Sequence, residues 1–343
     1  MISVIIPTRN RAQLLQVVLE SLAGQTLSSD LFEVLVIDNG SSDNTSEVAR
    51  RAQAFLTNTR YFHEPEPGLH AGRHRGLFEA RSDVLVFADD DIRAEASWLE
   101  AIAENFADPS VSMLGGNNYP DFQGHVPGWL NRLWNRQATE EKKLGELSVL
   151  SLPEGRRPIN PKLVWGCNFS IRKQVVLDAR GFHPDSMPKE LIHLRGDGET
   201  HISRYVQEHG LLCMFDSRAS VYHAVTPARM TFDYFHQRAF NQGVSDSYSQ
   251  LRHTAGKTLS PGNFSSAKDR LFGVVRRIAR WARENDTELR KLSGLYRQGH
   301  AAGFAFHQRA YRDDPHVRAW VHRQDYFQAM TPGSGECDAE PLS

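Results

Sequence analysis

Short apolar runs alternate with helix-like repeats over the first 120 residues of the chain. Three of these runs, at residues 2–6, 32–37 and 84–88, are rich in Val, Ile, Leu and Phe and predict β-strands. Strands that alternate with helices are typical of a parallel sheet whose crossover helices pack on its faces. The pattern therefore predicts an α/β fold.

A helical repeat connects the first two predicted strands. Apolar residues recur at helical spacing between residues 14 and 22, Gly24 follows as a helix stop, and Thr8 or Asn10 is expected to cap the start. The turn before this helix reads Pro-Thr-Arg-Asn, without the Gly-x-Gly-x-x-Gly turn of dinucleotide-binding folds, and the chain has no Walker-type phosphate loop. Dehydrogenase and P-loop classes therefore lose their main support.

The pattern becomes irregular beyond residue 120. Residues 121–161 carry scattered Gly, Pro and aromatic residues, and we interpret them as a long insertion or lid over the site. Apolar segments return at residues 163–171 and 211–215, on either side of a helical stretch that begins near Glu199 and ends at Gly210.

The overall composition is that of an ordinary globular protein, with 40% of the 343 residues hydrophobic. Forty Lys and Arg against 41 Asp and Glu give a net charge of -1, so no nucleic-acid partner is expected. The three cysteines, Cys167, Cys213 and Cys337, match neither a zinc motif nor a disulfide framework, which favours a cytoplasmic location. The chain contains no run of about 18 apolar residues that would predict a membrane-spanning helix.

The near-neutral sum conceals a basic C-terminal region. Residues 264–323 contain 13 Lys and Arg against 6 Asp and Glu, a net charge of +7. Apolar residues from Leu271 to Trp281 recur at helical spacing there, surrounded by arginines. Such a helix either makes a peripheral contact with an anionic membrane or packs its apolar face on the rest of the protein. Nucleic-acid binding is disfavoured because no binding module accompanies the charge.

Three carboxylates, Asp89, Asp90 and Asp91, directly follow the predicted strand at residues 84–88. Like charges this close together are unfavourable unless a cation or hydrogen-bond donors compensate them. Mg²⁺ or Mn²⁺, held by one or two carboxylates and a substrate diphosphate, would do so. The alternative is a solvated acidic turn that caps the next helix.

Further carboxylates lie at the ends of other predicted elements. Asp38 ends the second strand, at the edge where open α/β sheets bind ligands. The structural alternative is that Asp38 only caps the turn that follows. Asp197 and Glu199 precede the helical stretch, where the helix dipole alone would favour them.

Three of these segments, in this order, resemble a known family. Residues 3–11 (SVIIPTRNR), 34–43 (VLVIDNGSSD) and 87–91 (FADDD) resemble the nucleotide-sugar half of family 2 glycosyltransferases, which have the GT-A fold. The resemblance implies an α/β, Rossmann-like mixed sheet flanked by helices.

The resemblance also divides the chain. It implies a catalytic domain over residues 1–225, in which residues 1–120 bind the nucleotide sugar and residues 121–225 form the acceptor side. Residues 226–330 are then expected to form a basic, mainly helical C-terminal region, and residues 331–343 a disordered tail.

The family's motifs imply a donor side and a metal site. In the acidic motif the first carboxylate approaches the donor ribose and the last binds Mg²⁺ or Mn²⁺, so Asp91 takes the metal role, and His223 completes the site after the strand-like residues 219–222. The resemblance implies donor-binding roles for seven residues: Pro7, Thr8, Arg9, Asp38, Arg73, Asp89 and Asp90.

The resemblance also implies a catalytic base and an acceptor side. Residues 196–199 resemble the Glu-Asp-x-Glu element of inverting members, which gives the base role to Asp197 and support to Glu199, with the reverse left open. Residues 165–172 resemble a loop beside the donor sugar and acceptor, which implies roles there for Trp165, Gly166 and Asn168. A buried structural role is the alternative for the Trp165 ring.

Together these features predict an inverting, metal-assisted glycosyltransferase with a nucleotide-sugar donor, for which a UDP-sugar is favoured. The expected acceptor is a carbohydrate, a lipid-linked carrier or a small molecule. One rival is a sugar-nucleotide pyrophosphorylase, although its Gly-rich, Arg-containing first loop is absent after Ile6. The other is a non-catalytic sugar-binding or scaffold module on a degenerate GT-A fold, which metal-dependent donor turnover would exclude.

Overall fold

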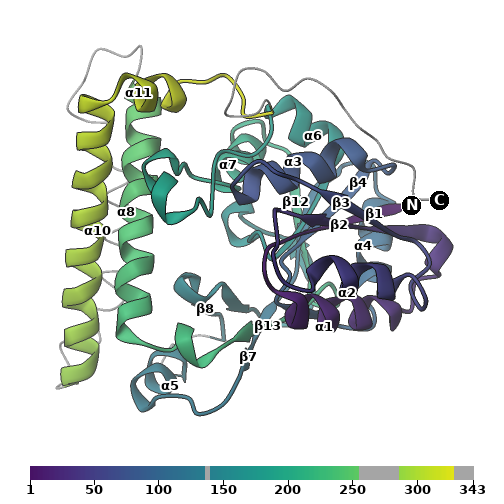
Figure 1. Cartoon of the computed structure of the whole chain (residues 1–343). Coiled ribbons are helices and arrows are strands. Elements are labelled where there is room, and N and C mark those ends of the chain that lie inside the picture. Colours follow the sequence, from purple (N-terminus) through teal and green to yellow (C-terminus); the bar gives the residue numbers. More distant parts are fainter. Residues whose placement is uncertain (136–139, 255–285, 328–343) are drawn as a thin grey trace.

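The computed structural model describes residues 1–135, 140–254 and 286–327 (Figure 1). Its main sheet has eight strands in the spatial order β10-β12-β6-β11-β4-β1-β2-β3. In that order the strands span Arg156–Pro158, Leu212–Asp216, Val111–Gly115, Asn168–Arg172, Val84–Ala88, Ile2–Thr8, Phe32–Asp38 and Thr59–His63.

Half of this sheet is parallel, as the alternating pattern predicts. Strand β1 pairs with both β2 and β4, and β2 pairs with β3. The register aligns Thr8 with Asp38, so the carboxyl ends of β1, β2 and β4 meet at one edge of the sheet. This arrangement brings motifs that are far apart in the sequence to a single edge, where Asp89 leaves β4.

Strand β11 makes the sheet mixed, because it pairs antiparallel with both β4 and β6. Helices cover both faces, and each face has its own hydrophobic cluster. On one face lie α1 (Ala12–Ala23), α2 (Thr45–Ala52) and α4 (Trp98–Phe106). On the other lie α3 (Leu69–Glu79), α6 (Lys173–Asp178) and α7 (Thr200–Glu208). The predicted α/β, mixed-sheet architecture is confirmed.

The start of α1 differs from the prediction. The N-cap residue is Arg11, whose side chain makes no cap bond, and Asp43 Oδ2 instead accepts from the backbone N–H of Ala12 at 3.2 Å. Asn10 instead has a positive φ of 54°, and its side-chain oxygen accepts from the backbone N–H of Ser42. The expected cap by Thr8 or Asn10 is therefore wrong, and Arg11 is free to reach the acidic motif.

A second, smaller sheet incorporates much of the segment interpreted as an insertion or lid. Its spatial order is β5-β13-β7-β9-β8, and α5 (Gly128–Asn135) packs near β8. In that order the strands span Ile92–Ala94, Val221–Val225, Asn118–Phe122, Val149–Ser151 and Lys142–Leu144. His223 lies within β13 and not after a strand, because the strand runs three residues beyond the predicted end at residue 222.

The C-terminal region is helical, as predicted. Helices α8 (Phe232–Thr254) and α10 (Thr287–Asp313) run side by side next to the sheets, and α11 (Pro315–Val321) follows (Figure 1). None of the helices in the described ranges combines the length and hydropathy needed to cross a bilayer. The basic repeat from Leu271 to Trp281 and the predicted tail at residues 331–343 lie outside the described residues.

The last described residues, Tyr326 and Phe327, contact α3. The Nδ1 atom of His74 lies 3.0 Å from the backbone oxygen of Tyr326, and its Nε2 accepts from the backbone N–H of Phe182. The Phe327 ring packs 4.9 Å from the His74 ring. The C-terminal region thus packs directly against α3.

Candidate functional site

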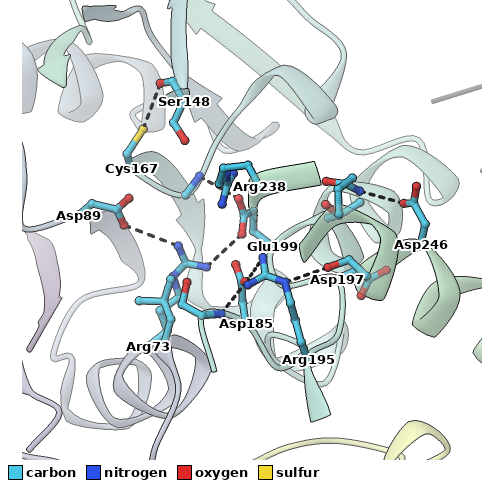
Figure 2. Close-up of a pocket in the computed structure, with 16 residues that line it drawn as sticks. Arg73, Asp89, Ser148, Cys167, Asp185, Arg195, Asp197, Glu199, Arg238 and Asp246 are labelled. Carbon is cyan, nitrogen blue, oxygen red and sulfur yellow. Dashed lines mark hydrogen bonds and ion pairs between the residues drawn. The ribbon is translucent and has the colours of Figure 1, made fainter. Parts of the chain in front are cut away.

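A polar pocket of about 170 Å³ opens beyond the carboxyl end of β4 (Figure 2). Its lining comes from the start of α3, the residues next to β4, β9 and β11, the segment that leads into α7, and one face of α8. Its lining includes the sequence-predicted residues Arg73, Asp89, Gly166, Asp197 and Glu199.

Arg73 links the donor side of this pocket to the predicted catalytic segment. The side chain is almost fully buried, donates to Glu199 Oε2 at 3.2 Å and lies 3.9 Å from Asp89 Oδ1 (Figure 2). The backbone N–H of Gly166 donates to the other Glu199 oxygen at 3.3 Å. A Cβ at Gly166 would overlap Arg73 Nη2, so this position needs glycine.

Arginines compensate the other two carboxylates of the acidic motif. Arg11 donates to Asp90 Oδ1 at 2.8 Å and to Asp91 Oδ2 at 3.1 Å, and Arg229 donates to the same Asp91 oxygen at 3.2 Å. Burial raises the pKa of Asp90 to about 6, against the opposing charge of Arg11. Burial also opposes ionisation of Asp91, but His223 and the two arginines hold the pKa of Asp91 at about 2.

The residues predicted to bind metal lie together. His223 Nε2 is 3.1 Å from Asp91 Oδ1, and both side chains are buried. A second set overlaps this pair: ligand atoms of Asp89, Cys167 and His223 all lie within 4.8 Å of one another. Carboxylate oxygens suit both Mg²⁺ and Mn²⁺, and an imidazole suits transition ions, so Asp89, Asp91 and His223 fit the expected ion, Mn²⁺ in particular. Sequence reasoning missed Cys167, because its spacing to the other cysteines carries no motif.

Asp38 lies buried at the same edge of the sheet. One of its oxygens accepts from the Tyr61 hydroxyl at 2.8 Å and the other from the backbone N–H of Ser41 at 2.7 Å. Thr8 and Pro7 are also buried, whereas Arg9 is exposed. Pro7, Thr8, Arg9 and Asp38 thus lie at the carboxyl ends of β1 and β2. Their contacts with a nucleotide base stay predictions.

The Asp197 carboxylate accepts hydrogen bonds at both of its oxygens. His183 Nδ1 lies 2.6 Å from one oxygen, and Arg204 and Ser249 donate to the other at 2.9 and 2.8 Å. Burial alone would raise the pKa of Asp197, but His183 and Arg204 hold that pKa well below its usual value. Such a carboxylate is a weak proton acceptor.

Two residues predicted for the acceptor side have structural contacts. The Trp165 indole donates to the backbone oxygen of Lys162, and its ring packs partly against two hydrophobic clusters. Asn168 is buried, accepts from the Trp98 indole and donates to the backbone oxygen of Ala219. Of the three acceptor-side predictions, only Gly166 lines the pocket.

The α8 side of the pocket was missed. Four α8 residues, three to four positions apart or adjacent, line it: Arg238, Gln242, Ser245 and Asp246. Arg195 joins this wall, donating to Ser245 Oγ at 3.0 Å and lying 2.6 Å from Asp185 Oδ1. The only sequence signal for this wall is a polar stripe at helical spacing, which is also typical of any solvated helix.

Residues 3–176, just over half of the chain, match the model of the family described as glycosyl transferase family 2. Among curated proteins, the chain is 36% identical over 124 residues to glycosyltransferase AglE of Haloferax volcanii, which covers 35% of this chain and 41% of that protein. It is 34% identical over 201 residues to the validoxylamine A glucosyltransferase of Streptomyces hygroscopicus, which covers 54% of this chain and 47% of that protein. The matches thus span less than half the length of these two relatives.

Among solved structures, a mannosyltransferase from Pyrobaculum calidifontis in complex with GDP-Man and Mn²⁺ superposes with a TM-score of 0.53 at 17% identity. The superposition covers 92% of this chain and 87% of that chain, so the likeness extends through the C-terminal helices. At 17% identity, this likeness is evidence for the fold alone. The chain belongs to glycosyl transferase family 2 and has the GT-A fold.

Proposed function

We propose that the protein is an inverting glycosyltransferase that moves a sugar from a nucleoside-diphosphate donor to an acceptor hydroxyl with the help of Mg²⁺ or Mn²⁺. One observation carries the proposal: Arg73 joins Asp89, from the predicted donor motif, to Glu199, from the predicted catalytic segment, in a single polar pocket. A one-step displacement needs a base and a donor-binding group on the same cavity.

On the donor side, we assign the nucleotide base to the edge formed by Thr8 and Asp38. Both Asp38 oxygens already accept protein donors, but a carboxylate has about four lone-pair sites. It therefore has room to accept the ring N–H of uracil, which supports a UDP-sugar. The buried Arg73 guanidinium lies where it would contact the donor's ribose or diphosphate beside Asp89.

A divalent ion would be held by Asp91 and His223, whose ligand atoms lie 3.1 Å apart. When bound, the ion neutralises charge on the departing nucleoside diphosphate. Arg11 and Arg229 both form ion pairs with Asp91 in this structure. If Asp91 bound the ion instead, the two guanidinium groups would be available to bind the diphosphate.

For the base, the contacts favour Glu199 over Asp197. Glu199 faces the pocket, and its carboxylate accepts from Arg73 and from the Gly166 backbone. Asp197 already accepts from three groups, His183, Arg204 and Ser249, and we assign it a supporting role in the segment. Glu199 would then take the proton from an acceptor hydroxyl that enters between it and α8.

Comparing Glu199→Gln with Asp197→Asn tests this assignment. The donor is first chosen by thermal shift with Mn²⁺ and a panel of UDP- and GDP-sugars. We expect Glu199→Gln to lower kcat about 10²- to 10⁴-fold, with a smaller fall in melting temperature than Asp197→Asn, because Arg73 keeps Asp89 as a neighbouring charge. We expect Asp197→Asn to lower the melting temperature first, because it removes a charge from a buried network. If Asp197→Asn abolishes turnover without loss of stability while Glu199→Gln stays active, Asp197 is the base.

The polar α8 wall supports an acceptor rich in hydroxyl or charged groups, such as a carbohydrate or the sugar end of a lipid-linked carrier. Arg238 and Gln242 offer donors there, and Asp246, which accepts from Gln242 at 2.9 Å, offers an acceptor. We expect Gln242→Ala to raise the KM for the acceptor and leave the KM for the donor unchanged. Steady-state kinetics with each substrate varied in turn measures this split.

A further inference from the structure

Cys167 lies where the proposed metal site meets the core. It precedes β11, whereas Asp89 follows β4 and His223 belongs to β13, so three separate elements converge on one point. The ligand atoms of the three residues lie within 4.8 Å of one another. Figure 2 shows the Cys167 and Asp89 side chains on the same side of the pocket.

Two features distinguish this thiol from an ordinary core cysteine. Its sulfur has one weak polar contact in the described part of the chain, 3.9 Å from the backbone oxygen of Ser148. The neighbouring His223 is 1% exposed, and its Nδ1 has no hydrogen-bond partner among the described residues. Both Cys167 and Cys213 are buried in hydrophobic clusters, but only Cys167 belongs to a group of potential metal ligands among the described residues. A buried imidazole with one unsatisfied nitrogen, beside a thiol and a carboxylate, indicates a ligand that supplies the missing bond.

We propose that Cys167 and Asp89 join Asp91 and His223 around the divalent ion, and that the sulfur ligand makes the site prefer the more thiophilic ions Zn²⁺, Co²⁺ and Mn²⁺ over Mg²⁺. The proposal rests on the proposed function only for the role of the ion. On binding, the thiol gives its proton to solvent and the thiolate forms a bond to the ion, without any change of oxidation state.

The spacing is compatible with such a site. Ligand atoms that bind one ion at about 2.0–2.3 Å lie about 3–4.5 Å from one another. The observed ligand atoms lie within 4.8 Å of one another, so small side-chain rotations would bring all three within binding distance of one ion. Thiolate ligands select softer ions, whereas Mg²⁺ prefers oxygen and keeps much of its water.

Spectroscopy of metal binding tests the proposal without any substrate. The chain has three cysteines, so the double variant Cys213→Ser, Cys337→Ser retains only Cys167. In untagged, chelator-treated protein titrated with Cd²⁺ or Co²⁺, we expect the ultraviolet charge-transfer band of a metal thiolate in wild type and in this double variant. We expect Cys167→Ser to lose the band and to bind Zn²⁺ at least tenfold more weakly by calorimetry.

Absence of the band in the double variant overturns the proposal, even if Cys167→Ser fails to fold. An unchanged band and Zn²⁺ affinity in a folded Cys167→Ser protein overturns it as well. A second readout is the ratio of turnover with Mn²⁺ to turnover with Mg²⁺, which we expect Cys167→Ser to lower. If no nucleotide sugar is turned over by wild type, the proposed function fails, while the titration still decides the role of Cys167.

Discussion

At the scale of single residues, the acidic motif shows how like charges share a buried edge. Sequence reasoning predicted that the three carboxylates need compensation, and a metal was the expected source. The structure adds Arg11 and Arg229 on Asp91, and Arg73 beside Asp89. Arg73 was expected at the site from its motif, whereas the pairing of Arg11 and Arg229 with Asp91 joins distant parts of the chain that no local pattern connects.

Gly166→Ala tests whether Arg73 and Glu199 must be held together. The new Cβ would overlap the Arg73 guanidinium and press on Glu199, so both groups would move. We expect turnover to fall about 100-fold, because displacement of reacting groups by about 1 Å has that effect. Gly145→Ala is the control, since nothing lies within 4 Å of its added Cβ. Equal turnover in the two variants would contradict this role for Gly166.

His70, on α3, gives a prediction for the pH dependence of stability. Burial lowers the pKa of His70 to about 4, although Asp185 opposes this and Arg73 and Arg323 support it. The unfolded chain, with a pKa near 6.5, takes up a proton first as the pH falls. The stability contributed by neutral His70 is therefore present above pH 6.5 and lost as the pH falls toward 4.

His70→Gln should reduce this loss. We expect wild type to lose up to about 3 kcal/mol more unfolding free energy than the variant between pH 6.5 and pH 4. Urea denaturation at each pH measures the difference, and comparison of the two proteins cancels the other buried histidines. Parallel pH profiles would show that His70 does not titrate in this way.

At the scale of elements, α8 and α10 touch backbone to backbone. Gly299 and Gly303 of α10 lie beneath the backbone oxygens of His236 and Phe240 of α8. Because α8 also supplies one wall of the pocket and the Ser249 bond to Asp197, the position of α10 bears on the site. A helix pair outside the matched family residues thus shapes one wall of the pocket.

Two alanine substitutions on α10 test this contact. Gly303→Ala would force its Cβ into the Phe240 backbone, and we expect it to destabilise the protein by about 1–3 kcal/mol. Gly294→Ala meets nothing within 4 Å, and we expect it to stabilise the helix by about 0.5–1 kcal/mol. Thermal and denaturant unfolding measure both, and the same sign for the two variants would contradict the close packing.

The elements differ in how far the sequence predicts them. Strands β1, β2 and β4 are continuous apolar runs because they are buried on both faces, and all three were predicted. Strand β3 is only partly buried and contains Thr59, Arg60 and His63, so it has no such run. Strands β8 and β9 have three residues each, too few for a period to be visible.

The candidate site was predicted to a similar degree. Residues carried by motifs, such as Asp89, Arg73 and Glu199, do meet in one pocket. The choice between Asp197 and Glu199 depends on donors from α7, α8 and the loop before α7, which no local pattern specifies. The same holds for Cys167, whose neighbours come from two different sheets.

At the scale of the whole molecule, the net charge of -1 hides the basic residues 264–323. Part of this stretch lies outside the described residues, and the part in α10 packs on α8. The membrane hypothesis predicts binding to vesicles rich in anionic lipid, weakened by salt and by changing Arg276, Arg277 and Arg280 to Gln. Sedimentation with vesicles measures this binding. If equal amounts of protein sediment with neutral and with anionic vesicles, the arginines contribute to the fold and not to membrane binding.

The central claim is that this family 2 protein uses a divalent ion at Asp91 to transfer a sugar from a nucleotide donor. Release of nucleoside diphosphate, measured with and without chelator, tests it most directly. We predict no release above background from chelated wild type, full recovery with Mn²⁺, no recovery in Asp91→Asn and normal recovery in Asp313→Asn, an exposed carboxylate on α10. Turnover that survives both chelation and Asp91→Asn would contradict the account.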